Sequence, residues 1–89
     1  MQQNTIIYRG VPRYSFRQLD EYANAVKGTA FRAFKRLEAE LTEGVDYFYL
    51  DAEQEREVIE ELRRHGLIYR STWNLVLLTN SGRHHLGLD

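Results

Sequence analysis

Among its 89 residues the chain has no cysteine, one proline, one tryptophan and one methionine. The lack of cysteine excludes disulfides, Cys-ligated zinc sites, iron–sulfur clusters and thiol nucleophiles. No uninterrupted apolar run approaches the roughly 18–20 residues that a transmembrane helix requires. The first residues, Met1 to Thr5, lack the basic and apolar regions of a signal peptide. We therefore expect a protein of the reducing cytoplasm, with no membrane partner.

Sequence motifs typical of enzymes are also missing. The chain has no glycine-rich phosphate loop, no Gly-x-Ser-x-Gly and no His-Glu-x-x-His. His84 and His85 are adjacent, so their side chains diverge on a helix and on a strand, which disfavours a two-ligand metal site. Glu60 and Arg64 have the i,i+4 spacing of a solvated helical pair, and this favours a surface role for the nearby carboxylates over general acid catalysis. We expect no catalytic residue, no metal site and no cofactor.

What remains is the composition of one small folded domain that spans residues 1–89. Hydrophobic residues make up 43% and charged residues 28% of the chain, and no low-complexity run interrupts it. A chain of this size buries only about 60–65% of the surface that it exposes when unfolded. We expect it to fold unaided, with modest stability.

The net charge of −1 conceals three blocks of opposite sign. Residues 1–36 hold seven Lys and Arg against two carboxylates, residues 37–62 hold ten carboxylates against one Arg, and residues 63–89 hold four Arg against one Asp. A polyanion could therefore meet a positive surface locally, although the whole chain offers no long-range attraction.

Hydrophobic periodicity and turn residues predict a small α+β domain with a helix-turn-helix-like pair and antiparallel hairpins, a winged-helix-like arrangement. Ser15 and Gln18 have the spacing of a capping box, as do Asp51 and Gln54, and Thr29 can cap the second helix. The expected elements are strands 6–8 and 11–14, helices 16–24 and 29–41, strand 45–50, a helix from Asp51 to just before Gly66, strands 67–71 and 75–79, and a short helix that Asn80 or Ser81 caps.

The second helix carries the strongest functional signal. Ala30, Phe34, Leu37 and Leu41 form an apolar stripe, whereas basic side chains turn to the other side. In a helix-turn-helix the second helix enters the major groove, and a hairpin over residues 67–79 could serve as a wing. The residues that we expect to contact DNA are Arg13, Arg17, Lys27, Thr29, Arg32, Lys35, Arg36, Arg70 and Trp73.

Two of these features have plainer interpretations. The basic stripe is also what a solvated amphipathic helix shows, with no ligand. Trp73 is also compatible with a half-buried turn aromatic that closes the core.

Four short segments are similar to a known family. They are Ile-Ile-Tyr-Arg-Gly-Val at 6–11, Phe-Lys-Arg at 34–36, Glu-Gly-Val-Asp-Tyr-Phe at 43–48 and Leu-Leu-Thr-Asn-Ser-Gly at 77–82. Together with the helix pair they resemble the amino-terminal domain of phage antirepressors of the KilA-N and Bro-N kind. The resemblance implies a phage regulator of mixed α/β structure that binds double-stranded DNA. The hypothesis allows a homodimer.

The acidic middle block supports an alternative hypothesis. A small phage protein could keep this fold and use its surface to bind and inhibit a host defence complex, in the manner of an anti-CRISPR protein. The expected contacts are then the acidic helix, Tyr47, Tyr49 and Trp73, because aromatic anchors and charge complementarity characterise such interfaces.

Overall fold

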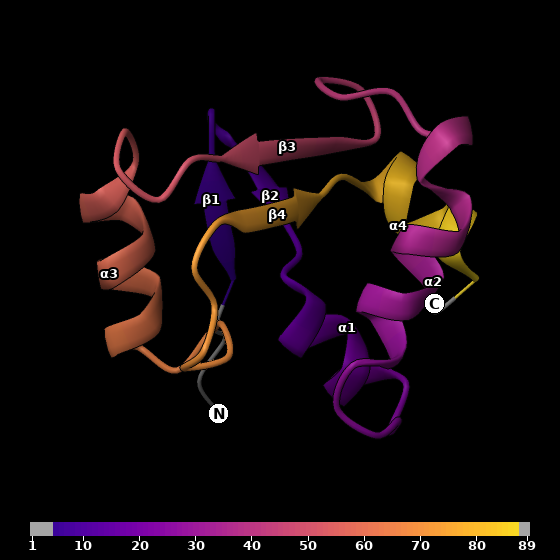
Figure 1. Cartoon of the computed structure of the whole chain (residues 1–89), viewed down its shortest axis with the longest axis horizontal. Helices are drawn as coiled ribbons and strands as arrows, with labels where there is room; N and C mark the ends of the chain where they lie inside the picture. Colours follow the sequence, from indigo (N-terminus) through magenta and orange to yellow (C-terminus); the bar gives the residue numbers. More distant parts are fainter. Residues whose placement is uncertain (1–4, 88–89) are drawn as a thin grey trace.

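The computed structural model describes residues 5–87 and has a small α+β fold (Figure 1). Within that range the chain forms four α-helices and two antiparallel two-stranded sheets. None of these helices is long and apolar enough to cross a bilayer. In chain order the elements are β1 (Ile6–Tyr8), β2 (Val11–Arg13), α1 (Phe16–Tyr22), α2 (Thr29–Leu37), the 3-10 turn η1 (Glu38–Glu40), β3 (Tyr47–Leu50), α3 (Arg56–Arg64), β4 (Leu75–Leu78) and α4 (Asn80–Leu86).

The predicted amino-terminal hairpin is confirmed. β1 pairs with β2 with Tyr8 opposite Val11, so that Arg9 and Gly10 form a two-residue turn. Both turn residues have positive φ, 57° and 77°. A two-residue hairpin turn of this kind matches the twist of the strands and favours glycine at its second position.

Helices α1 and α2 form the predicted pair, with caps that differ in detail. Ser15 and Gln18 make the complete capping box at the start of α1. The cap of α2 is Gly28, with φ 95°, and the expected cap, Thr29, is instead the first helical residue. The hydroxyl of Thr29 donates a hydrogen bond to the carbonyl of Val26. The α-helix ends at Leu37 rather than at Leu41, because the chain tightens into η1.

The β3–β4 sheet separates two hydrophobic cores. Leu50 and Leu77 pack on one side with Ile6 and Ile59, in contact with β1 and α3. On the other side Leu78 packs with residues of α1, α2 and α4, such as Leu19, Phe34 and Leu86. Both faces of these strands are thus at least partly covered, although Tyr49 stays exposed.

The prediction of a wing hairpin over residues 67–79 is wrong. Residues 67–74 form an irregular loop, and β4 pairs with β3 instead, Leu50 opposite Leu75. Side chains distant in the sequence satisfy the carbonyls of this loop: Ser15 donates to Leu67, and Arg63 donates to Arg70 and Thr72. Because the loop obtains its hydrogen bonds in this way, it needs no strand partner.

Two helix starts also differ from prediction. Asp51 accepts hydrogen bonds from the amides of Glu53 and Gln54, but the residues after it form turns, and α3 begins only at Arg56. α4 begins after Thr79, whose hydroxyl accepts from the amide of Gly82. The expected caps, Asn80 and Ser81, therefore lie inside the helix.

Candidate nucleic-acid interface

Helix α2 presents one apolar and one basic face, as its sequence predicts. Ala30, Ala33 and Phe34 are buried, while Arg32, Lys35 and Arg36 are exposed. The burial of one face fixes the helix against the core, and the three cations are left at the surface of a rigid element. The basic residues are therefore available to a partner.

The three cations differ in their carboxylate partners. The ammonium of Lys35 lies 3.0 Å from Oε1 of Glu38, one turn further along the chain. Arg32 and Arg36 form no ion pair with any residue between 5 and 87. Their positive charge is the part of this face that is left uncompensated.

The amino terminus of α2 is closed to external anions by Asp20. This carboxylate, only 1% exposed, accepts hydrogen bonds from the amide of Gly28 at 2.9 Å and from the amide of Ala30 at 2.7 Å. A helix start usually attracts phosphate because its amides are unpaired. Here a side chain already occupies that position, and the Thr29 hydroxyl is engaged with Val26. Contact with a nucleic acid must therefore come from side chains.

Arg17 and Lys27 meet at the ring of Tyr69. The guanidinium carbon of Arg17 lies 5.9 Å from the ring centroid and the ammonium of Lys27 lies 4.9 Å from it. Arg17 also pairs with Glu21 at 3.1 Å. Burial, followed by the hydrogen bond to Asp20, raises the pKa of Tyr69 well above its ordinary value. The Tyr69 side chain thus stays neutral, and its ring contacts both cations.

Three of the expected DNA contacts lie away from α2. Arg13 stacks on Phe48, with its guanidinium carbon 4.6 Å from the ring centroid, and donates to the carbonyl of Tyr8. Arg70 is exposed, but on the irregular loop and not on a wing. Trp73 is 73% exposed, and the hollow that it lines is formed by α3 and the turn before it. The half-buried alternative for Trp73 is therefore wrong.

The carboxylates are divided between two places. Those of α3 lie at the opposite end of the molecule from α2 (Figure 1). On α3, the hydrogen bond from His65, followed by the charge of Arg64, lowers the pKa of Glu61. Glu38 and Glu40 instead follow α2 directly. Asp20 lies against the amino terminus of α2, so both ends of this helix have an acidic neighbour.

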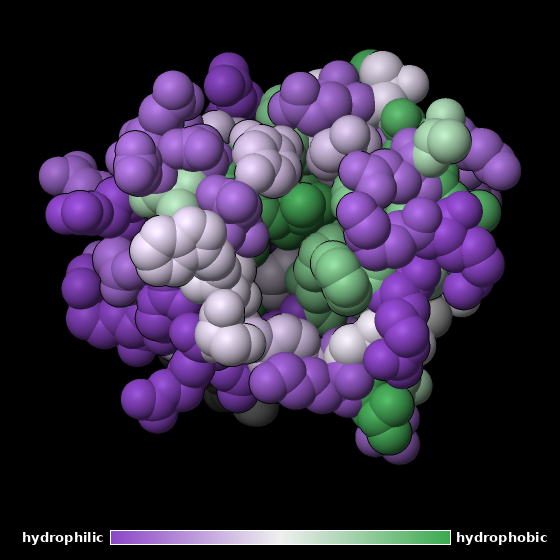
Figure 2. Space-filling view, viewed as in Figure 1, coloured by the Kyte–Doolittle hydropathy of each residue, from purple (hydrophilic) through white to green (hydrophobic). Residues whose placement is uncertain are grey.

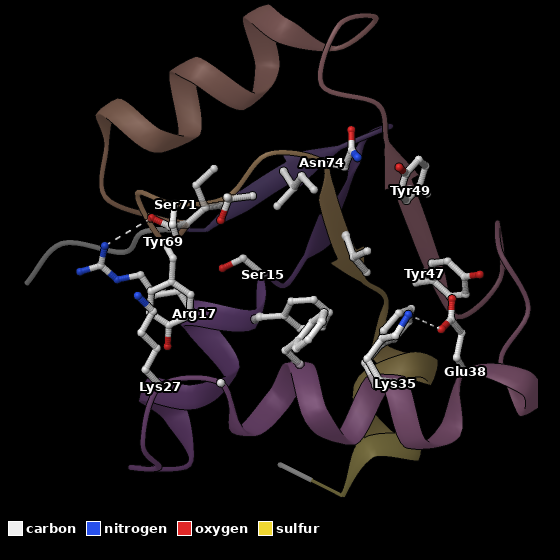
Figure 3. A pocket seen from close by; sticks show the side chains of 18 of the residues that line it. Ser15, Arg17, Lys27, Lys35, Glu38, Tyr47, Tyr49, Tyr69, Ser71 and Asn74 are labelled. Carbon is white, nitrogen blue, oxygen red and sulfur yellow. Dashed lines mark hydrogen bonds and ion pairs between the residues drawn. The ribbon is translucent and has the colours of Figure 1, made fainter.

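A cavity of about 760 Å³ opens beside α2 and was not anticipated from the sequence. Figure 2 shows it as a hollow whose floor is apolar and whose rim is polar. Its walls come from α1, α2, β3, the start of β4 and the loop before β4. In Figure 3, Arg17 and Lys27 stand at one end of it and Lys35 and Glu38 at the other. The aromatic residues that line it are Phe16, Phe31, Phe34, Tyr47, Tyr49 and Tyr69.

No protein-family model, curated protein or solved structure matches this chain.

Proposed function

We propose that this protein binds double-stranded DNA through the exposed face of α2, as a phage regulator of the antirepressor kind acting in the bacterial cytoplasm. The observation that carries the proposal is the pair Arg32 and Arg36. They lie one turn apart on the solvent side of an anchored helix, and no carboxylate between residues 5 and 87 pairs with them. Arginines in such positions bind phosphates and read guanine.

The dimensions of α2 support this proposal. An α-helix with its side chains is about 10–12 Å across, and the major groove of DNA, about 12 Å wide, admits it. The nine residues of α2 would extend along the groove for about 14 Å. Lys27 lies just before the helix, and Lys35 lies between the two arginines in the chain. Phosphate contacts from these lysines would position the helix without reading sequence.

The distribution of acids supports the same orientation. The carboxylates of α3 lie at the far end of the molecule (Figure 1). DNA would repel that end and attract the end with α2, so a molecule of net charge −1 can still dock in one orientation. The proposed contacts are the side chains of Arg17, Lys27, Arg32, Lys35 and Arg36.

The salt dependence of duplex binding tests the proposal. The logarithm of the association constant should fall linearly with the logarithm of salt concentration, and Arg32→Gln and Arg36→Gln should each flatten this slope by about 1. Arg64→Gln is the matched control, since Arg64 is exposed on α3 and already bonded to Glu61. A double variant of Arg32 and Arg36 that keeps the wild-type slope would refute the assignment of α2.

A second candidate function, inhibition of a host protein complex, is favoured by one observation. Trp73 is the most exposed of the large hydrophobic side chains between residues 5 and 87, and it lies beside the acidic helix α3. Exposed tryptophans are frequent anchors of protein interfaces. If this function holds, Trp73→Ala should abolish a stable complex recovered from host lysate, while Val26→Ala, at an equally exposed position, should not. Tyr47 and Tyr49 line a different hollow and are not part of this surface.

A further inference from the structure

The cavity beside α2 has the size and the walls of a small-molecule site. Its volume of about 760 Å³ falls in the range of roughly 300–1,000 Å³ that is typical of ligand pockets. The aromatic walls are fixed by mutual contact: the ring centroid of Phe34 lies 5.5 Å from that of Phe16 and 5.0 Å from that of Tyr47. The hollow is therefore formed in advance and does not need to be opened by a ligand.

Two aromatic side chains at its rim are left open to solvent. Phe31 is 49% exposed and Tyr49 is 52% exposed. The ring of Phe31 packs edge-on with that of Phe16, at 5.6 Å between ring centroids. Covering such apolar surface with a flat apolar group is favourable, because it removes that surface from water.

The two ends of the cavity differ in electrostatic character. At the end with Lys35, the opposing charge of Glu38 already compensates the ammonium. Glu43 lines this end as well. Burial raises the pKa of Tyr47, and the charges of Glu38 and Glu43 raise it further. This end is therefore balanced or slightly negative.

The end with Arg17 and Lys27 carries a lysine that forms no ion pair. Lys27 forms no ion pair with the described residues 5–87, and its ammonium stands over the face of Tyr69. Glu21 pairs with Arg17, and Asp20 accepts its three hydrogen bonds from two amides and the phenol of Tyr69. Lys27 thus faces the cavity without a direct ion-pair partner, beside Arg17, which shares Glu21 (Figure 3).

We propose that this cavity binds a small planar aromatic molecule that carries an anionic group. The aromatic ring lies among Phe31, Phe34 and Tyr49, and the anion points toward Lys27. The proposal shares Arg17 and Lys27 with the proposed DNA contacts, but it rests on the cavity and not on Arg32 and Arg36, which do not line it.

A pair of probes of equal shape and opposite charge tests the ligand class. Naphthalene-2-carboxylate and 2-naphthylmethylammonium are titrated against the full chain, and amide chemical shifts are followed by NMR. The carboxylate should bind more tightly by about 25-fold, because one unit charge near 4 Å in a solvated site favours the carboxylate and disfavours the ammonium by about fivefold each. Shifts should concentrate at the amides of Lys27, Phe31 and Tyr49. Equal affinities, shifts scattered over the surface, or no binding at millimolar concentration would each overturn the proposal.

Three variants distinguish a specific contact with Lys27 from a general electrostatic effect of positive charge. Lys27→Gln should remove most of the preference for the carboxylate, because the carboxylate loses an attraction and the ammonium probe loses a repulsion. Phe31→Ala should weaken both probes. Arg36→Gln removes the same charge from an exposed position of α2 outside the cavity, and it should leave the preference intact. If Arg36→Gln and Lys27→Gln reduce the preference equally, no specific contact with Lys27 exists.

Discussion

The phenol of Tyr69 donates a 2.5 Å hydrogen bond to Oδ2 of Asp20, which lies 49 positions earlier in the chain. The same carboxylate accepts from the amides of Gly28 and Ala30. One buried side chain of α1 therefore caps α2 and also fixes the loop that closes the cavity. The orientation of the proposed reading helix and the shape of the adjoining hollow depend on the same residue.

Asp20→Asn should destabilise the fold by about 2–3 kcal/mol, because an amide has one acceptor oxygen and leaves at least one buried N–H unpaired. Urea unfolding followed by circular dichroism measures the effect. Glu21→Gln is the control on the neighbouring residue, which pairs with Arg17 at the surface. It should cost less than about 0.5 kcal/mol, and equal losses in the two variants would show that Asp20 has no such role.

The hydrogen bond of Tyr69 also predicts an alkaline dependence. Burial first, and Asp20 second, raise the pKa of Tyr69 in the folded state. Below about pH 10 the phenol is neutral in the folded and in the unfolded chain, so the hydrogen bond of Tyr69 contributes fully to the free energy of unfolding there. Above that pH it ionises more readily in the unfolded chain, and the contribution is lost as pH rises. The free energy of unfolding should therefore fall more steeply for the wild type than for Tyr69→Phe. Parallel curves between about pH 9 and pH 11 would contradict this prediction.

Gly82→Ala should be strongly destabilising, although alanine is the better helix former. A Cβ at this position of α4 would collide with the backbone carbonyl oxygen of Asp46. Helix propensity alone favours alanine by about 1 kcal/mol, whereas forced displacement of packed backbone costs about 1–3 kcal/mol or more. Thermal unfolding measures the net effect. Asn80→Ala, at an exposed position of the same helix, is the control, and a stabilised Gly82→Ala protein would show that the close approach is absent.

Arg63→Gln should loosen the loop before β4. Arg63 donates to the carbonyls of Arg70 and Thr72 at 2.9 and 2.8 Å, so its loss removes two bonds, a cost of about 1–3 kcal/mol. Amide hydrogen exchange in residues 70–74 should become faster. Arg64→Gln, the neighbouring exposed arginine, should leave exchange there unchanged. An effect of the same size in both variants would mean that lost helical charge, and not the loop contacts, is responsible.

Features that depend on neighbouring residues were predictable from the sequence. The Ser15–Gln18 capping box, the Arg9–Gly10 turn and the two faces of α2 all follow from spacings of four residues or fewer. The α+β class follows from these same local patterns.

The path of residues 67–74 could not be predicted in this way. Leu67 to Tyr69 have the composition of a strand, yet Ile68 is buried in a core and the carbonyls of Leu67 and Ile68 are satisfied by Ser15 and Arg17. The burial of Asp20 could not be predicted either, since nothing in its local sequence indicates it. The cavity could not be predicted, because its walls come from separate segments of the chain. The one signal in the sequence is Phe31, an aromatic residue of α2 that lies outside the apolar stripe of this helix.

Strands β3 and β4 are separated in the chain by α3, yet they share one sheet whose opposite faces complete both apolar clusters. A chain cleaved at the turns that follow Asp51 would leave Leu50 on one fragment and its partner Leu75 on the other. Neither fragment should hold its shape alone, and mixing the two should restore the native spectrum. The protein should thus behave as a single cooperative unit, which can be reassembled from its two parts but not divided into independent modules.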